Sequence, residues 1–147
     1  MAEYNYASGD ANAKDGKIGT FDQLYPTAHD KYGLADQIGW KNLRHIRSGM
    51  ELKPTAKLAT STKYNSYWLA DPHDALYNLQ SVAIVRRADG GAGRFVGQAI
   101  DASALYTWSK EVQIGGGISH FFTGTFLENT GRRHGYTGPY LFVNYTY

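Results

Sequence analysis

The chain has 147 residues, which is enough for one domain, and only 19% of them are charged, below the roughly 25% of a typical soluble domain. Twelve Tyr and seventeen Gly are the informative excess, because Tyr favours half-buried pleated surfaces and membrane interfaces while Gly marks turns. The lack of Cys excludes disulfides, thiolate metal sites and a Cys nucleophile. A net charge of +2 gives no general footprint for nucleic acid, so no nucleic-acid partner is predicted.

Hydrophobic periodicity predicts strands rather than helices. No stretch approaches the roughly 18 apolar residues that a membrane-spanning helix needs. Residues 1–10 lack the charged region and the apolar core of a signal peptide. Alternation with a period of two is common along the chain, and we therefore predict an all-β, antiparallel fold. The predicted strands cover roughly 3–8, 40–53, 56–69, 97–109, 111–123 and 138–147.

The connections between these strands alternate between short and long. Only Pro54-Thr55 separates the second and third strands, and only Lys110 separates the fourth and fifth. Transmembrane barrels alternate in this way, with short periplasmic turns and long extracellular loops, whereas a soluble sandwich has no reason to do so. If the last strand runs inward and Tyr147 ends in the periplasm, every long loop lies outside. The predicted extracellular loops are about 9–39, 70–96 and 124–137.

Each of the last three strands divides into an apolar face and a small or polar face. In 97–109 the even positions include Ile100 and Trp108, while the odd positions include Asp101 and Ser103. Apolar-out, polar-in alternation is the rule for membrane barrels. The strand 40–53 fits least well, because Arg44 falls on its apolar face near the outer end. Five aromatic residues fall at strand ends, where interfacial girdles lie: Trp40, Trp68, Trp108, Tyr140 and Tyr147.

Six long segments contain rare residues in a fixed order: EYNYASGD, GTFDQLYPTAHDKYG, GWKNLRHIRSGMELKPTAKL, YNSYWLADPHDALYN, FVGQAIDASALYTW and SHFFTGTFL. Together they resemble the C-terminal region of the alginate-export family of Gram-negative outer-membrane proteins. The resemblance covers about Glu3 to Tyr147. The terminal aromatic residue, after alternating Leu141, Val143 and Tyr145, is similar to the signal that barrel-assembly machinery recognises.

The resemblance implies an outer-membrane channel for passive passage of an anionic, alginate-like polysaccharide or a related solute. Its partners would be outer-membrane lipid, the solute and the barrel-assembly machinery, and it implies no cofactor. Family members are much longer, and six strands cannot close such a barrel. Residues 1–147 are therefore expected to form the C-terminal part of a single barrel domain. The alternatives are a small-solute porin of the same family and a soluble carbohydrate-binding β-sandwich.

The predicted lumen face carries cations that would attract the carboxylates of a polyuronate, and aromatic rings that could stack on sugars. We predict that Arg47 and Lys63 contribute to anion selectivity. The alternative is that the lumen charges are there only because the lumen is wet, with Lys53 and Lys57 as simple rim charges. The predicted pore-lining residues are Lys41, His45, Arg47, Lys53, Lys57, Lys63, Tyr67, Asp101, Phe121 and Tyr140.

Other motifs carry no chemistry. Residues 8–16 resemble a calcium loop only in passing, because Lys14 occupies a ligand position and no Glu closes the loop. The five His residues have no metal-ligand spacing, so no metal site is predicted. No nucleophile motif is present, and 90–93 lack the context of a phosphate-binding loop. The chain is therefore not expected to be an enzyme.

Overall fold

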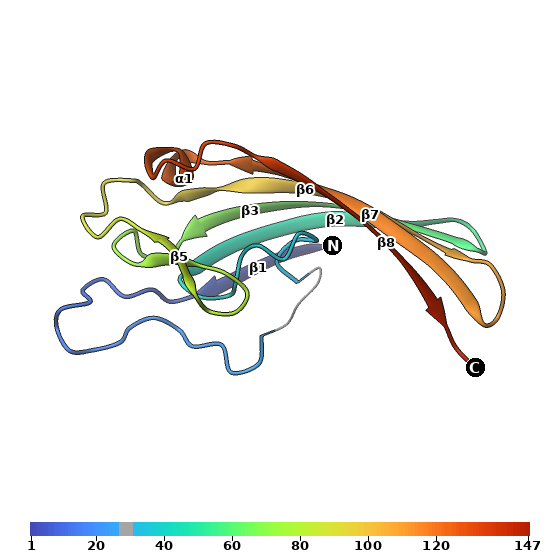
Figure 1. Cartoon of the computed structure of the whole chain (residues 1–147), viewed down its shortest axis with the longest axis horizontal. Helices are drawn as coiled ribbons and strands as arrows, with labels where there is room; N and C mark the ends of the chain where they lie inside the picture. The colour runs from blue at the N-terminus through green and yellow to red at the C-terminus, as the bar shows by residue number, and fades with distance from the viewer. Residues whose placement is uncertain (27–30) are drawn as a thin grey trace.

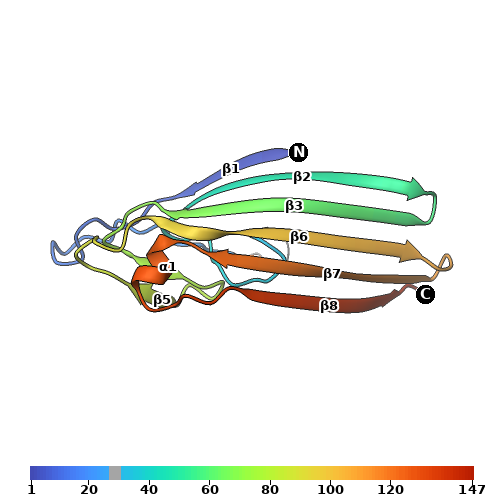
Figure 2. The ribbon, with the colours of Figure 1, turned by 90° about the horizontal axis from the view of Figure 1, so that it is seen from above.

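The computed structural model, which describes residues 1–26 and 31–147, is dominated by one antiparallel sheet. Its six strands lie in the order β1-β2-β3-β6-β7-β8 (Figure 1). The sheet is open, with β1 and β8 at its edges (Figure 2). This confirms the all-β, antiparallel prediction of five long strands and a short one. The strands are β1 (Ala2–Ala7), β2 (Leu43–Thr55), β3 (Leu58–Leu69), β6 (Phe95–Thr107), β7 (Val112–Thr123) and β8 (Tyr136–Tyr145).

Short and long connections lie at opposite ends of the sheet. Figure 2 shows the β2–β3 and β6–β7 turns at one end and the long connections at the other. The turn predicted at Pro54-Thr55 lies two residues later in the structure. Strand β2 continues through Thr55, after a register irregularity that follows Leu52. Proline has no N–H for the ladder and is tolerated at such irregularities. The turn therefore falls at Ala56 and Lys57.

Two of the long connections contain elements that periodicity did not predict. Residues 70–94 include the hairpin of β4 (Ala75–Tyr77) and β5 (Ala83–Arg86), and residues 124–135 include α1 (Thr125–Asn129). These elements are too short to show a period of 2 or 3.6. α1 is held by the burial of Phe126 and Leu127. No helix within the described residues is long and apolar enough to cross a membrane.

The two faces of the sheet differ in burial. We call the face of the even positions in β2, β3 and β7, and in β6 from Gln98 onward, the outer face, and the opposite one the inner face; the register of β6 shifts before Gly97, so Val96 lies on the inner face. The inner face carries the buried core, which includes Leu43, Tyr67 and Phe121. A soluble sandwich would bury its apolar side chains, whereas here they stay exposed, as on the lipid face of a barrel. The exposed set includes Tyr4, Ile46, Met50, Tyr64, Ile100, Ile114, Ile118, Leu141 and Val143.

Two of the five aromatic residues assigned to the girdle were assigned wrongly. Trp40 precedes β2 and packs within the loop layer, with its ring centroid 4.9 Å from that of Phe21 and 6.0 Å from that of Tyr32. Tyr140 pairs with Gly117 and lies on the inner face, because a Cβ at Gly117 would meet its ring at 2.7 Å. A place at the end of a strand does not determine the direction of a side chain. The other three residues, Trp68, Trp108 and Tyr147, lie at positions that are consistent with a girdle.

The loop end of the sheet is tied together by one buried carboxylate, Asp74. It accepts hydrogen bonds from the backbone N–H of Asp10 at 2.9 Å, the hydroxyl of Tyr77 at 2.9 Å and the guanidinium of Arg86 at 2.5 Å. Burial raises the pKa of Asp74, but the hydrogen bond from Thr20 and those from backbone N–H groups outweigh it and hold the pKa below its ordinary value. Asp74 therefore links the first and second long connections as a charged group at neutral pH.

Replacing Asp74 by Asn should loosen both connections. Hydrogen bonds to a charged group contribute about 1.5–3 kcal/mol each, so we expect backbone amides of 8–20 and 70–94 to exchange at least about tenfold faster. Hydrogen-exchange mass spectrometry of the protein in detergent measures this. The matched control is Asp89→Asn, because Asp89 bonds only within its own exposed turn among the described contacts. Equal acceleration in both variants would contradict the linking role of Asp74.

Candidate functional site

The candidate functional site is the inner face of the sheet, where part of the first long connection lies against the strands. Residues 31–39, here called the inner segment, run below the sheet in the view of Figure 1. The hydroxyl of Tyr67 on β3 donates to the carbonyl oxygen of Tyr32 at 3.0 Å. The N–H of Leu34 donates to Asp101 Oδ2 on β6 at 3.3 Å. The connection therefore does not stay outside the sheet but folds onto its inner wall.

A chain of polar side chains crosses the wall beneath this segment. Asn5 Nδ2 lies 3.3 Å from His45 Nδ1, and His45 Nε2 lies 3.0 Å from Asn65 Oδ1. Asn65 then donates to Asp101 Oδ2 at 2.7 Å. Because an amide nitrogen can only donate, His45 Nδ1 must accept, and its proton lies on Nε2. His45 is thus held as one neutral tautomer that connects β1 through β6.

Charged groups fix the inner segment at its start. Glu3 on β1 pairs with Arg47 on β2 at 2.8 Å and with Lys31 of the inner segment at 3.1 Å. The Arg47 side chain is only 9% exposed. A guanidinium in such a position is largely neutralised and has little contact with solvent. Arg47 therefore helps to anchor the segment, through Glu3.

The structure brings most of the predicted pore-lining residues onto one face. Strand register places seven of them there, and Lys63 lies directly opposite Asp101. These seven are His45, Arg47, Lys63, Tyr67, Asp101, Phe121 and Tyr140.

Three predicted lysines lie apart from this cluster. Lys53 and Lys57 are exposed at the turn end of the sheet, where Lys53 lines a hollow on the inner face. Lys41 precedes β2, pairs with Asp22 at 3.1 Å and sits 5.2 Å from the centre of the Tyr77 ring. Lys41 thus belongs to the loop layer.

Toward the turn end, none of the described contacts of the inner segment reaches the inner face. A hollow there is lined in part by Glu51, Lys53 and Lys63, with Ser61 and Ser103 between them. Two lysines and one glutamate thus surround a hollow whose floor carries hydroxyl groups.

Several residues of the inner face were not predicted to take part. Asn65 and Ser119 were visible only as polar members of alternating strands, and the contacts of the inner segment link residues about 30 to 70 positions apart. One local signal existed. Gly33 has a φ of +100°, and a Cβ there would lie 2.6 Å from the Tyr67 hydroxyl. A glycine is needed where backbone approaches a side chain so closely. The unpredicted set is Glu3, Asn5, Lys31, Tyr32, Leu34, Asn65 and Ser119.

Comparison with known proteins agrees with this architecture. The model of the family described as alginate export matches residues 1–143, nearly the whole chain. The curated proteins include no match to it. The family consists of outer-membrane β-barrel proteins with a role in polysaccharide export. An antiparallel sheet with an apolar outer face and a polar inner face is what such a barrel requires. The chain belongs to the alginate-export family.

Proposed function

We propose that this sheet is part of the wall of an outer-membrane channel, with lipid on its outer face and a solute-filled lumen on its inner face. The observation that carries the proposal is the contrast between those faces, one exposing large apolar side chains and the other bearing a polar network. Strands of 12 and 13 residues extend for roughly 40 Å, which is enough to cross a lipid band about 25 Å tall when tilted.

We further propose that the solute is an anionic polysaccharide, and that Lys53 and Lys63 contact it. Both lie on the inner face toward the turn end, where the inner segment makes none of its described contacts. Several weak charge contacts suit conduction better than one tight site, because the solute must also leave. Arg47 is a weaker candidate for this contact, because its guanidinium is paired with Glu3 and nearly buried.

A second candidate function is passage of small solutes only, and the inner segment favours it. The segment occupies space on the lumen side at the loop end, so it narrows the path along this wall. A narrow constriction admits a small anion more readily than a hydrated sugar chain. Comparing a uronate oligomer with small anions separates the two functions.

Removing both lumen lysines should weaken the interaction with a uronate oligomer. In planar bilayers containing the complete barrel, we expect the concentration of oligomer that half-blocks the ion current to rise about fivefold for each lysine removed, and so roughly 25-fold in Lys53→Gln/Lys63→Gln. A unit charge at about 4 Å in water contributes roughly 1 kcal/mol, which is about a fivefold change. The control is Lys110→Gln, in the exposed β6–β7 turn. Uncharged oligomers of equal length should block equally in all three proteins.

If uronate and uncharged oligomers block alike in the wild-type protein, the anionic-polysaccharide proposal is wrong. Block by neither oligomer, with small anions still conducted, would instead establish the small-solute function.

Releasing the inner segment should change the channel. In Tyr67→Phe the segment loses the hydrogen bond to Tyr32, worth about 0.5–1.5 kcal/mol, so its displaced state should become up to about tenfold more populated. Single-channel recording should show this as more frequent current fluctuations. The control is Tyr64→Phe, a neighbour on β3 whose hydroxyl donates to Gln98 at 2.6 Å on the outer face. The same fluctuations in the control would contradict the constriction role.

A further inference from the structure

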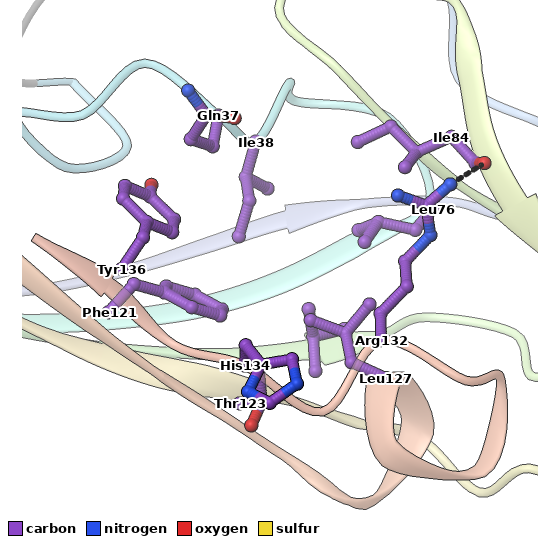
Figure 3. Close-up of a pocket in the computed structure, with 11 residues that line it drawn as sticks. Gln37, Ile38, Leu76, Ile84, Phe121, Thr123, Leu127, Arg132, His134 and Tyr136 are labelled. Carbon is purple, nitrogen blue, oxygen red and sulfur yellow. Dashed lines mark hydrogen bonds between the residues drawn. The ribbon is translucent and has the colours of Figure 1, made fainter.

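A pocket at the loop end of the inner face has no part in the proposed passage of polysaccharide. It lies between the inner segment, the β4–β5 hairpin, α1 and the start of β8 (Figure 3). Its volume is about 190 Å³. We call it the mouth pocket. It is separate from the lysines at the turn end, because none of its lining residues is shared with the hollow around Lys53 and Lys63.

Most of the lining of the mouth pocket is apolar. Aliphatic side chains come from the inner segment, the hairpin, β6 and α1. One end is closed by two stacked aromatic rings, Phe121 and Tyr136, whose centroids are 5.8 Å apart with an interplanar angle of 17°. Such walls favour an apolar ligand surface and offer few partners for hydroxyl groups. The aliphatic lining residues are Ile38, Leu76, Ile84, Val96 and Leu127.

The polar groups of the mouth pocket are cationic or neutral. Figure 3 shows Arg132 reaching across the pocket, where its Nη2 donates to the carbonyl oxygen of Ile84 at 3.2 Å. His134 lies beside Thr123 on the same side. None of the lining residues is Asp or Glu, and no ion pair joins Arg132 to a carboxylate in the described part of the chain. A guanidinium carries five N–H donors and can bind a carboxylate through two of them.

We propose that the mouth pocket binds a small carboxylic acid with one aromatic ring. The ring lies among the aliphatic side chains against Phe121 and Tyr136, and the carboxylate pairs with Arg132. The size fits, because an apolar cavity of about 150 Å³ accommodates benzene. A sugar fits poorly, because its hydroxyls would lose their water without gaining partners on the aliphatic walls. The proposal therefore adds a ligand class different from the polysaccharide.

The position of the pocket gives this ligand access to the inner segment. Ile38 belongs to that segment, and the other walls come from the β4–β5 hairpin, from α1 and the loop after it, and from the loop ends of β6, β7 and β8. A ligand bound there contacts the hairpin, α1 and the segment at once. The site can be probed without any measurement of solute passage, so it does not depend on the channel proposal.

Fluorine NMR of 4-fluorobenzoate, mixed with the complete barrel in detergent, tests the proposal. We expect saturable broadening of its resonance, with affinity at least about tenfold lower in Arg132→Gln because charge-assisted hydrogen bonds are among the strong ones. Ile84→Trp should abolish binding by filling the pocket, which keeps the test valid if Arg132→Gln folds poorly. The control is Arg133→Gln, which removes a neighbouring exposed arginine that does not line the pocket.

Two further probes separate the contributions of charge and ring. The uncharged 4-fluorobenzyl alcohol should bind at least about tenfold more weakly than the acid, for lack of the carboxylate. Glucuronate, which has the charge but not the apolar ring, should not displace 4-fluorobenzoate. Displacement by glucuronate at similar concentrations would overturn the proposal in favour of a sugar-acid site. No saturable binding, or equal loss in Arg132→Gln and Arg133→Gln, would also overturn it.

Discussion

The register of the antiparallel strands is the constraint on which the rest of the molecule depends. Side chains alternate between faces, so a slip of one residue moves a whole set to the opposite face. In this chain such a slip between β2 and β3 would turn His45 or Asn65 to the apolar outer face, which we propose contacts lipid. Polar groups in hydrocarbon lack partners, and a charged side chain on the lipid face costs about 2–4 kcal/mol at the midplane. The polar chain from Asn5 to Asp101 therefore stabilises one register as well as the wall itself.

Polar contacts also hold the loop layer. The inner segment is fixed by Glu3, Tyr67 and Asp101. The first and second long connections are joined through Asp74. Apolar packing contributes as well, through a buried cluster that includes Phe126 of α1 and the aliphatic walls of the mouth pocket. The loop layer is thus positioned by polar and apolar contacts together.

The faces of the strands were predictable from the sequence because alternation is local. Asp101 and Ile100 fall on opposite sides whatever the remainder of the chain does, and the structure places them so. Contacts between distant residues were not predictable. Nothing near Tyr32 indicates that its carbonyl meets Tyr67, apart from the glycine that follows it. The hairpin and α1 were too short for any periodic signal, and Trp40 was misassigned because its neighbours in space lie in a loop.

The way in which the inner segment is attached to the sheet affects how the sequences of related barrels can vary. The ion pair and the two hydrogen bonds described above join the segment to β1, β3 and β6, and the N–H of Gly39 donates to the carbonyl oxygen of Tyr77 on β4 at 3.0 Å. The segment is therefore encoded together with these polar contacts, between β1 and β6. Substitutions elsewhere in a barrel can change its other walls while the inner segment keeps its place on this one. Conversely, grafting β1 through β6 into a related barrel would carry the segment and these contacts with it.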